Sequence, residues 1–482
     1  MTLGSALSSA LSGLAANTRA VDVLSGNLAN ALTEGFAPRE ITLAATRDSR
    51  GVQVTGVVRQ VDQGLLSDRR LADSARAASE VQARFARSVE NAVGTPDAPN
   101  SLTGRLAAFE VALETAANRP EDTNRLAAVL SAAQGPTTGI NDAAADIARL
   151  RTAADRDIAT AVQALNAGLK DVAALNAQIT KGQSRGHDIT ALEDQRQRAI
   201  DALSLIVPLR QLPRGDTSVA LVTTGGGMLL DGRAVSLTFE PAPLVTPHMT
   251  YKGGHLSGIA IDGTEVTIAA DRGPLQGGRL GALFDIRDRA AVEVNAKLDV
   301  LARDLVERFQ EPGLDATRAP NAPGFLTDAG TAFAAENEPG IANRIAVTRL
   351  VDPAQGGALF RIRDGLGAPL AGPPGSGALL GALSRALTQS SSLPSGLLGG
   401  GTRSVADHAA TLISSLSLER VATEERQSFA TGQAAEFRAQ ELATGVDSDA
   451  ELQRLLLVEQ AFGANARMIQ TIDDMLDTLL RI

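Results

Sequence analysis

At both ends of this 482-residue chain, apolar residues recur at alternating steps of four and three. This heptad spacing is typical of an amphipathic helix that buries one stripe of side chains against another helix. We call the two stripes the N-terminal seam and the C-terminal seam, and we expect them to form an assembly interface. Its residues are Leu3, Leu7, Leu14, Asn17, Val21, Leu24 and Leu28, with Ala10 completing the spacing, and Leu455, Val458, Phe462, Asn465, Ile469, Ile472, Leu476 and Leu479.

Polar residues also shape these two helices. Ser448 and Glu451 stand three positions apart before the C-terminal seam, which predicts a capping box at the helix start. Asn17 and Asn465 each occupy a core position of a seam, where an asparagine commonly fixes the register and copy number of paired helices. The alternative is an ordinary bundle helix that tolerates one polar residue.

The composition excludes several classes of function. The chain has no cysteine, which excludes disulfides, thiolate catalysis, iron-sulfur clusters and cysteine-ligated zinc. Its net charge is −10, with no block of basic residues, so we expect no nucleic-acid partner. Only 3% of the residues are aromatic, so stacking platforms for bases or sugars are not expected. We also expect neither a membrane span nor a cleavable secretory signal.

The interior of the chain is largely helical in its spacing. A bundle of long helices is therefore expected. The stretch from Ile147 to Ile179 would measure about 50 Å if it were unbroken, although Gly168 could bend it. Helical spacing occurs at Leu102–Leu113, Ile147–Ile179, Leu280–Leu305 and Val405–Leu416.

The period changes after Pro208, where short runs alternate apolar with polar residues as half-buried strands do. Asp231-Gly232 and Asp262-Gly263 separate such runs, and Asp-Gly suits tight hairpin turns. We therefore expect a small antiparallel domain over 205–277, and we expect the helices to keep their stability without it.

A second irregular stretch covers about 313–400. It contains the strand-like runs 344–347 and 359–362, and its serine and glycine clusters at 390–392 and 399–401 suggest a flexible connector. The expected fold class is α+β and mainly α. We expect a terminal coiled-coil domain of 1–35 with 445–482, a helical rod domain of 36–204 with 278–312 and 401–444, the small antiparallel β domain of 205–277, and a reduced irregular outer region of 313–400.

No common catalytic motif is present in the sequence. It lacks the zinc helix, the phosphate loop, the nucleophile elbow and the dinucleotide turn. His248 and His255 are close in sequence but have no neighbouring carboxylates, so we interpret them as solvated loop residues. We expect neither an enzyme nor a cofactor, and a binding or assembly role outweighs catalysis.

Short motifs at both ends resemble the bacterial flagellar axial proteins. At the start these are Ser12-Gly13-Leu14, Asn27-Leu28-Ala29-Asn30 and Glu34-Gly35-Phe36, with Arg39 beyond. At the end they are Thr444-Gly445-Val446-Asp447, 464–471 and 475–480. Within that family, Asp194-Gln195-Arg196-Gln197-Arg198 and Gly277–Leu283 resemble the proteins of the hook-filament junction.

The resemblance implies a structural subunit of the flagellum that is exported by the type III apparatus and assembles as a ring between hook and filament. The protein would be cytoplasmic before export and extracellular afterwards. The implied partners are the flagellar hook protein, a second junction protein called hook-associated protein 3, an export chaperone on the C-terminal helix, and further copies of the chain. The alternatives are a rod or hook protein of the same family, or an extracellular coiled-coil scaffold or adhesin.

Overall fold

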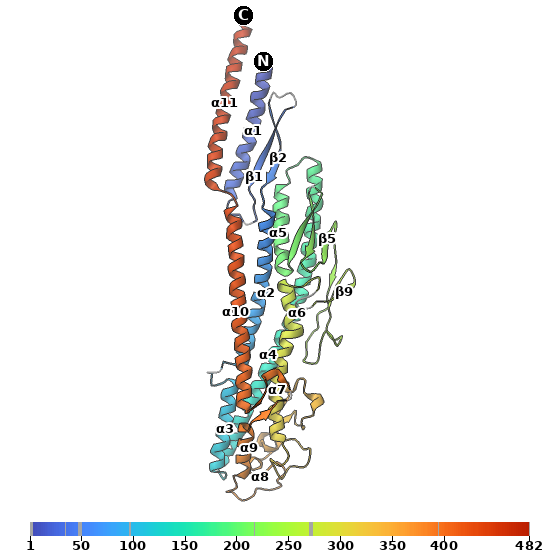
Figure 1. Ribbon diagram of the computed structural model, residues 1–482, viewed down its shortest axis with the longest axis vertical. Coiled ribbons are helices and arrows are strands. Elements are labelled where there is room, and N and C mark those ends of the chain that lie inside the picture. The colour runs from blue at the N-terminus through green and yellow to red at the C-terminus, as the bar shows by residue number, and fades with distance from the viewer. Residues whose placement is uncertain are drawn as a thin grey trace.

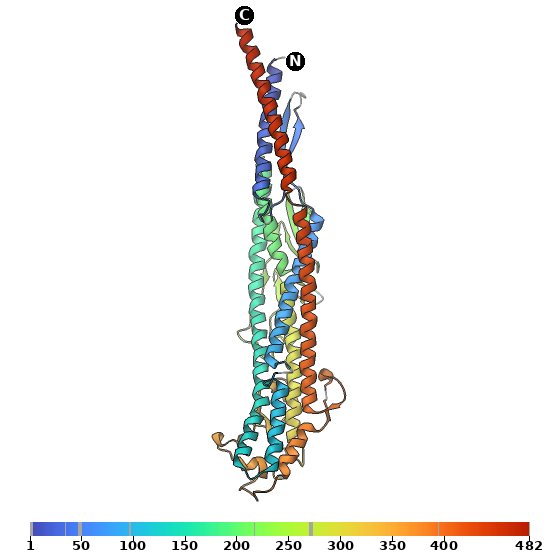
Figure 2. The same cartoon turned by 90° about the vertical axis from the view of Figure 1, so that its left-hand side faces the viewer.

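The computed structural model describes residues 3–33, 35–46, 51–95, 98–215, 217–268, 273–393 and 395–481; Glu34 of the N-terminal motif lies outside them. The chain forms a long rod whose main helices run along its axis (Figures 1 and 2). The first and last helices lie side by side at one end, which we call the terminal end. Short helices and loops close the opposite, distal end (Figure 1).

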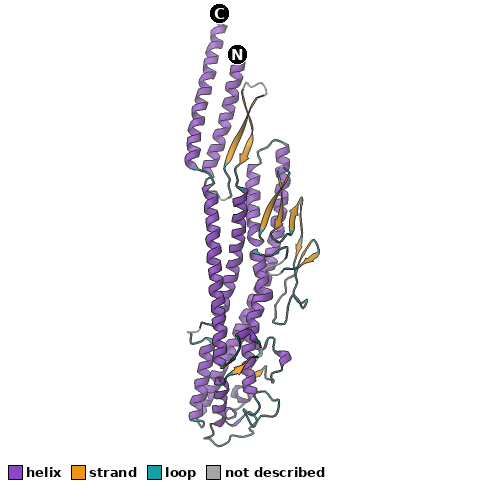
Figure 3. Ribbon diagram, in the orientation of Figure 1, coloured by secondary structure: helices purple, strands orange, loops and turns teal. Residues whose placement is uncertain are grey.

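Helices dominate the structure, as Figure 3 shows, and the expected α+β class with mainly helical content is confirmed. A π-helical turn, Ile286–Ala290, joins α6 to α7. The α-helices are α1 Leu3–Ala29, α2 Gln63–Val93, α3 Leu102–Asn118, α4 Thr123–Ser184, α5 Thr190–Ile206, α6 Gly278–Asp285, α7 Ala291–Gln310, α8 Phe360–Asp364, α9 Ala378–Thr388, α10 Val405–Ala443 and α11 Ser448–Leu480.

The strands form small sheets in which every recorded pairing is antiparallel. A hairpin pairs β1 Arg39–Ala45 with β2 Val52–Arg59. The others are a four-stranded sheet in the order β3 Leu209–Arg214, β4 Ser218–Thr223, β5 Met228–Asp231 and β6 Arg233–Ala234; a three-stranded sheet of β7 Leu237–Thr238, β8 Ile259–Ile261 and β9 Thr264–Val266; and the pairs β10 Leu326–Asp328 with β11 Ile345–Val347 and β12 Ser391–Ser392 with β13 Thr402–Arg403.

The longest element is α4, which extends well beyond the predicted stretch. Its 62 residues correspond to about 90 Å at 1.5 Å per residue. The helix continues through Gly168, where an added Cβ would lie 2.6 Å from Leu203 Cδ2. Gly168 therefore permits close packing of α5 on α4.

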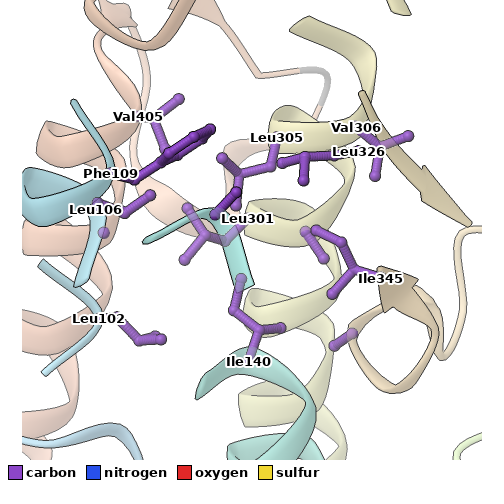
Figure 4. Close-up of a cluster of buried hydrophobic side chains, with 14 of the residues drawn as sticks. Leu102, Leu106, Phe109, Ile140, Leu301, Leu305, Val306, Leu326, Ile345 and Val405 are labelled. Atoms are coloured by element: carbon purple, nitrogen blue, oxygen red, sulfur yellow. The ribbon is translucent and has the colours of Figure 1, made fainter. Parts of the chain in front are cut away.

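A first hydrophobic core fills the distal end (Figure 4). Three phenylalanines from α3, α7 and the segment before β10 meet in its centre, with ring centroids 5.8 to 6.0 Å apart. Leucine, isoleucine and valine side chains from α3, α4, α7, β10, β11 and α10 surround them. The three rings belong to Phe109, Phe309 and Phe325.

A second core lies where the β region meets α4 and α5. Leu221, Leu230 and Leu237 of the sheets are buried among side chains such as Ile158, Leu165 and Leu203 of the helices. The sheets therefore complete the core of the rod. This speaks against the expectation that residues 205–277 are dispensable for helix stability, because the strands cover apolar surface that the helices would otherwise expose to water.

The tight turn of this region agrees with the prediction. Asp262 and Gly263 connect β8 to β9 with φ values of 48° and 80°. Both central residues of a two-residue hairpin turn of this type need positive φ, which Asp-Gly supplies.

Two expectations for the outer stretch are wrong. The run 359–362 belongs largely to α8, since one helical turn also places Leu359 and Ile362 on one side. The serine cluster is no free connector either. Ser391 pairs with Arg403 in the β12–β13 ladder, and its hydroxyl donates to Asp304 Oδ1 over 3.1 Å.

The start of α11 differs from the predicted capping box of Ser448 and Glu451. The N-cap residue is Asp447 and not Ser448.

The π-helical turn places a charged side chain inside the rod. Arg287 is completely buried; its Nη1 lies 2.7 Å from Asp155 Oδ1 on α4, and its Nη2 lies 2.8 Å from Asp288 Oδ2. The guanidinium also lies over the rings of Phe239 and Phe284. A π-helical turn adds a residue to a helix, and here it brings Arg287 to face α4.

Asp299 of α7 holds the outer region to the helical body. Its two carboxylate oxygens accept hydrogen bonds from the backbone N–H groups of Gly340 and Ala342, each over 2.9 Å. Burial of the carboxyl raises its pKa from 3.8 to about 6, although these hydrogen bonds lower it. A carboxyl whose pKa is raised by folding stabilises the fold at low pH and loses that contribution as the pH rises.

We expect the Asp299→Asn variant, which does not titrate here, to gain stability relative to the natural protein as the pH rises from about 4 to 7. The relative gain should be about 2 kcal/mol, since one pKa unit corresponds to about 1.4 kcal/mol and the unfolded carboxyl, with a pKa of 3.8, is already more than half ionised at pH 4. Urea unfolding of both proteins across this range measures it. A difference that is independent of pH would contradict the prediction.

Candidate assembly interface

The two terminal helices form an antiparallel pair. The chain enters α1 at the free tip of the terminal end and leaves α11 beside it (Figure 1). An added Cβ on Gly13 would lie 2.7 Å from Asn465 Nδ2, so α11 approaches α1 closely at this point. Asn17 does not face Asn465 at hydrogen-bond distance; its Nδ2 is buried with no hydrogen-bond partner among the described residues.

The N-terminal and C-terminal seams face each other within one chain. Ile472 is buried, while Phe462, Leu476, Leu479 and Leu28 are exposed. The half-buried seam residues are Leu3, Leu7, Leu14, Asn17, Val21, Leu24, Leu455, Val458, Asn465 and Ile469. Exposed apolar side chains occur along the whole of α11, from Leu452 to Leu480, and this helix extends past the start of α1 (Figure 1). A role of these residues toward other subunits stays a prediction.

The Ser12-Gly13 motif serves two neighbours of α1. The Ser12 hydroxyl accepts a hydrogen bond from the backbone N–H of Val52 over 3.2 Å, at the start of β2. Gly51 also lies against this hydroxyl, since an added Cβ would be 2.5 Å from Ser12 Oγ. Ser12 thus binds the β1–β2 hairpin through a hydrogen bond, and the adjacent Gly13 leaves room for the close approach of α11.

Asn27 fixes the start of the hairpin to the last turn of α1. Its side chain is fully buried; Nδ2 donates to the carbonyl of Arg39 over 2.9 Å, and Oδ1 accepts from the Arg39 N–H over 3.0 Å. The amide therefore pairs with Arg39 as a neighbouring strand would. This arrangement explains the first asparagine of the terminal motif, since alanine or leucine could make neither bond.

Acidic residues on α5 connect the hairpin to the rod. Asp194 pairs with Arg39 over 2.8 Å and with Arg59 over 2.7 Å, so one carboxylate holds both strands. Asp188, just before α5, pairs with Arg19 of α1 over 3.0 Å. The Asp194–Arg198 motif therefore lies where the terminal pair meets the helical body.

A buried charge cluster lies at the same level. Arg69 of α2 pairs with Asp73, with Asp201 of α5 and with Glu441 of α10, over 2.9, 2.7 and 2.6 Å. Burial raises the pKa of Glu441, although Arg69 opposes this shift. The cluster joins three helices just below the Thr444-Gly445-Val446-Asp447 link between α10 and α11. Spacing alone did not single out Arg69 or Glu441.

We expect Gly13→Val to loosen the packing of α11 on α1, because the added side chain would displace the Asn465 side chain from this contact. The body should keep its melting temperature, since both hydrophobic cores lie outside the terminal pair. Limited proteolysis should cut the terminal helices of the variant faster than those of the natural protein.

Gly26→Ala is the matched control, because its added Cβ meets nothing within 4 Å. Alanine is the better helix former, so this variant should resist the protease at least as well as the natural protein. Equal cleavage of the Gly13→Val variant and the natural protein would refute the close approach.

Comparisons with known families follow this division of the rod. Residues 7–36 match the family model "Flagella basal body rod protein", and residues 443–482 match "Flagellar basal body rod FlgEFG protein C-terminal". Residues 86–323 match "Flagellar hook-associated protein FlgK helical domain". The two terminal segments define a flagellar axial protein. Because the helical domain between them is that of FlgK, the chain belongs to the family of flagellar hook-associated protein 1, a family of structural flagellar proteins.

Curated relatives are similar along much of their length. Flagellar hook-associated protein 1 of Escherichia coli K12 is 23% identical over 354 residues, covering 70% of this chain and 61% of that protein. The Salmonella typhimurium protein is 23% identical, covering 64% and 56%. The Bacillus subtilis protein is 23% identical over 517 residues, covering 98% and 97%. The chain thus spans about three fifths of the length of the first two relatives.

Among solved structures, the flagellar hook junction protein FlgK from Burkholderia pseudomallei is similar to this chain. It has a TM-score of 0.43 and 19% identity, covering 55% of this chain and 47% of that one. None of the described helices combines the length and the apolar composition that a membrane-spanning helix requires.

Proposed function

We propose that the protein is a structural subunit of the junction between the flagellar hook and filament. The observation that carries the proposal is the combination, in one chain, of axial-protein segments at both ends with a FlgK helical domain between them. The geometry supports it, because the two ends meet at one pole of a rod and leave apolar side chains exposed there. A terminal end of this kind is suited to packing against neighbouring copies in a ring, with the rest of the rod extending away from the ring.

The finer assignments belong to the same proposal. The neighbours in the flagellum are the hook protein on one side and hook-associated protein 3 on the other, with further copies of this chain in the ring. The protein passes the type III export apparatus from the cytoplasm and ends outside the cell. Before export, a chaperone covers the apolar side chains of α11.

Deletion of the gene in the bacterium that encodes it tests the proposal. We expect cells that carry hooks without filaments, seen by electron microscopy, with filament growth restored by the natural gene. A rod or hook protein would instead be needed before hooks are complete. Deleting a scaffold or adhesin would leave the filaments intact.

Two aspartates in the C-terminal seam should abolish chaperone capture. Phe462→Asp with Ile469→Asp places charge in the apolar stripe of α11, which lies outside both hydrophobic cores. A pull-down with the chaperone should fail, and the thermal melt of the helical body should stay unchanged.

Gln460→Asp with Gln470→Asp is the matched control, because both glutamines are exposed on the same helix. It should retain chaperone binding. An unaltered pull-down of the seam variant, or a drop of several degrees in its body melt, would contradict the assignment of α11 as the chaperone site.

A further inference from the structure

A second stripe accompanies each seam and is exposed throughout. On α1 it follows each seam residue by one position, and on α11 it precedes each seam residue by one. We call these sets the α1 stripe and the α11 stripe. The α1 stripe consists of Gly4, Ser8, Leu11, Ala15, Thr18, Asp22, Ser25 and Ala29, and the α11 stripe of Arg454, Leu457, Ala461, Ala464, Met468, Thr471, Met475 and Thr478.

The two stripes differ in size. The α11 stripe has three large apolar side chains, with Leu457 65%, Met468 49% and Met475 50% exposed, spaced by alanine and threonine residues. The α1 stripe presents small residues, apart from Leu11 and Asp22. Large side chains on one helix and small ones on the other allow two helices to approach closely and interdigitate.

Helix geometry places the stripes on opposite sides of the terminal pair. One position along a helix is a turn of about 100°. If both stripes followed their seams by one position, they would lie on the same side of the antiparallel pair. The two-fold axis that relates the two helices of such a pair exchanges the helices but leaves each side of the pair where it is. Here the offsets have opposite senses. The α1 stripe therefore faces away from the side on which the α11 stripe lies.

Two different faces on opposite sides are what a closed ring of identical copies requires. In such a head-to-tail contact, one face of each copy meets the other face of the next copy. A neighbour placed beside the terminal pair, with its helices parallel to the same axis, would bring its α1 stripe to the α11 stripe.

The charges of the stripes are complementary in sign and in height. Asp22 is the single charged residue of the α1 stripe, and Arg454 is the single charged residue of the α11 stripe. Since Gly13 faces Asn465, counting along the antiparallel helices brings Asp22 level with Leu456, two residues from Arg454. That is about 3 Å along the axis.

Neither Asp22 nor Arg454 makes a close ion pair within the described part of its own chain. Asp22 is exposed and makes no ion pair among the described residues. The Arg454 side chain is 59% exposed, and its Nη1 lies 3.6 Å from Glu451 Oε1. Both can therefore bind a charge on a neighbouring molecule.

We propose that the α11 stripe of one copy binds the α1 stripe of a second copy of this chain, and that Arg454 pairs with Asp22 across the contact. The seams then hold one copy together, while the stripes join copies, so that α1 and α11 alternate around the ring. This inference rests on the proposed function, and it deepens that function by naming the faces that meet.

Charge reversal tests the contact in cells whose own gene is deleted. Asp22→Arg and Arg454→Asp, each alone, should strongly reduce the fraction of cells with filaments, because like charges then face each other. The two changes together should restore filaments. Asp22→Arg with Arg467→Asp, on another exposed part of α11, should not. Singles without effect, or a double variant without rescue, would overturn the proposal.

A cysteine pair gives an independent readout, since the natural chain has no cysteine. Leu11 is level with Arg467, next to Met468, so Leu11→Cys with Met468→Cys should form disulfides between copies in isolated flagella. Denaturing gels would show a ladder of multimers. Gly13→Cys with Asn465→Cys should close within one chain and remain monomeric. Monomer alone, or a disulfide to a different protein, from the first pair would refute the stripe contact.

The two hypotheses fail separately. Filaments on the deletion strain would refute the junction function itself. A deletion strain without filaments, in which charge reversal has no effect or the cysteine ladder is absent, would refute only the stripe contact.

Discussion

Replacing Arg287 with methionine is expected to lower the free energy of unfolding by about 3 to 5 kcal/mol, because removing one partner of a buried ion pair strands the other charge. The stranded group is Asp155, whose side chain is 1% exposed on α4. Methionine fills much of the volume, so the lost charge and hydrogen bonds account for most of the change. Chemical denaturation monitored by circular dichroism measures it.

Arg214→Met is the matched control for this experiment. Arg214 also pairs with a carboxylate, that of Asp231, but both side chains are nearly half exposed on the edge of the β region. Exposed ion pairs contribute about 0 to 1 kcal/mol. Equal losses in the two variants would show that Arg287 is accessible to water and that the π-helical turn does not bury it.

Deleting residues 208–277 and joining Val207 to Gly278 by a short linker is expected to abolish the cooperative melt of the middle of the rod. The deletion uncovers the apolar faces of α4 and α5. It also removes fully buried leucines such as Leu221 and Leu230, each worth about 1.5 to 3 kcal/mol. Circular dichroism should show a loss of helix well beyond the deleted residues, which are mainly strand and loop.

An insertion of a few glycine and serine residues between Asp262 and Gly263 controls for changes in chain length. This exposed turn joins β8 to β9, so the insertion should leave the melting temperature unchanged. A deletion protein with the natural helical signal and melting temperature would show that the shared core contributes little.

The long helices and the family could be predicted because their signals are local and repeated. The steps of four and three along both seams identify α1 and α11 without reference to the rest of the chain. The structure explains the terminal motifs by their contacts. Ser12 accepts a hydrogen bond from the hairpin, Gly13 lies against α11, and Asn27 donates a hydrogen bond to Arg39.

The β1–β2 hairpin was missed, although the sequence held a signal for it. Val52, Val54 and Thr55 to Val58 are β-branched apart from one glycine, and β1 opposite them contains Ile41 and Thr42. Alternation is poor because the register shifts between Thr42 and Leu43, so the period of two is interrupted. The tertiary ion pairs with Asp194 complete the hairpin, and no local pattern reveals them.

The dependence of the rod on the β region could not be read from the sequence. Alternation of apolar and polar residues shows that a strand buries one face, but it does not show which surface covers that face. Arg151 illustrates the difference, since its guanidinium donates to the backbone carbonyls of Thr246, Met249 and Arg287. These partners are so distant from Arg151 in sequence that no local pattern predicts them, and only the folded structure identifies them.

The terminal end can form only when both α1 and α11 are present, because the two helices pair with each other. Gly13 and Asn465, which lie in contact, are separated by almost the whole polypeptide, so this contact forms only after every intervening residue has been made or threaded through. A chain that stops before α11 leaves its N-terminal seam uncovered and, under the proposed stripe contact, lacks one of the two stripes that join neighbouring copies. Such a fragment could occupy a place in a growing ring on one side only. Under the proposed contact, only a chain that contains both α1 and α11 can present both stripes at once.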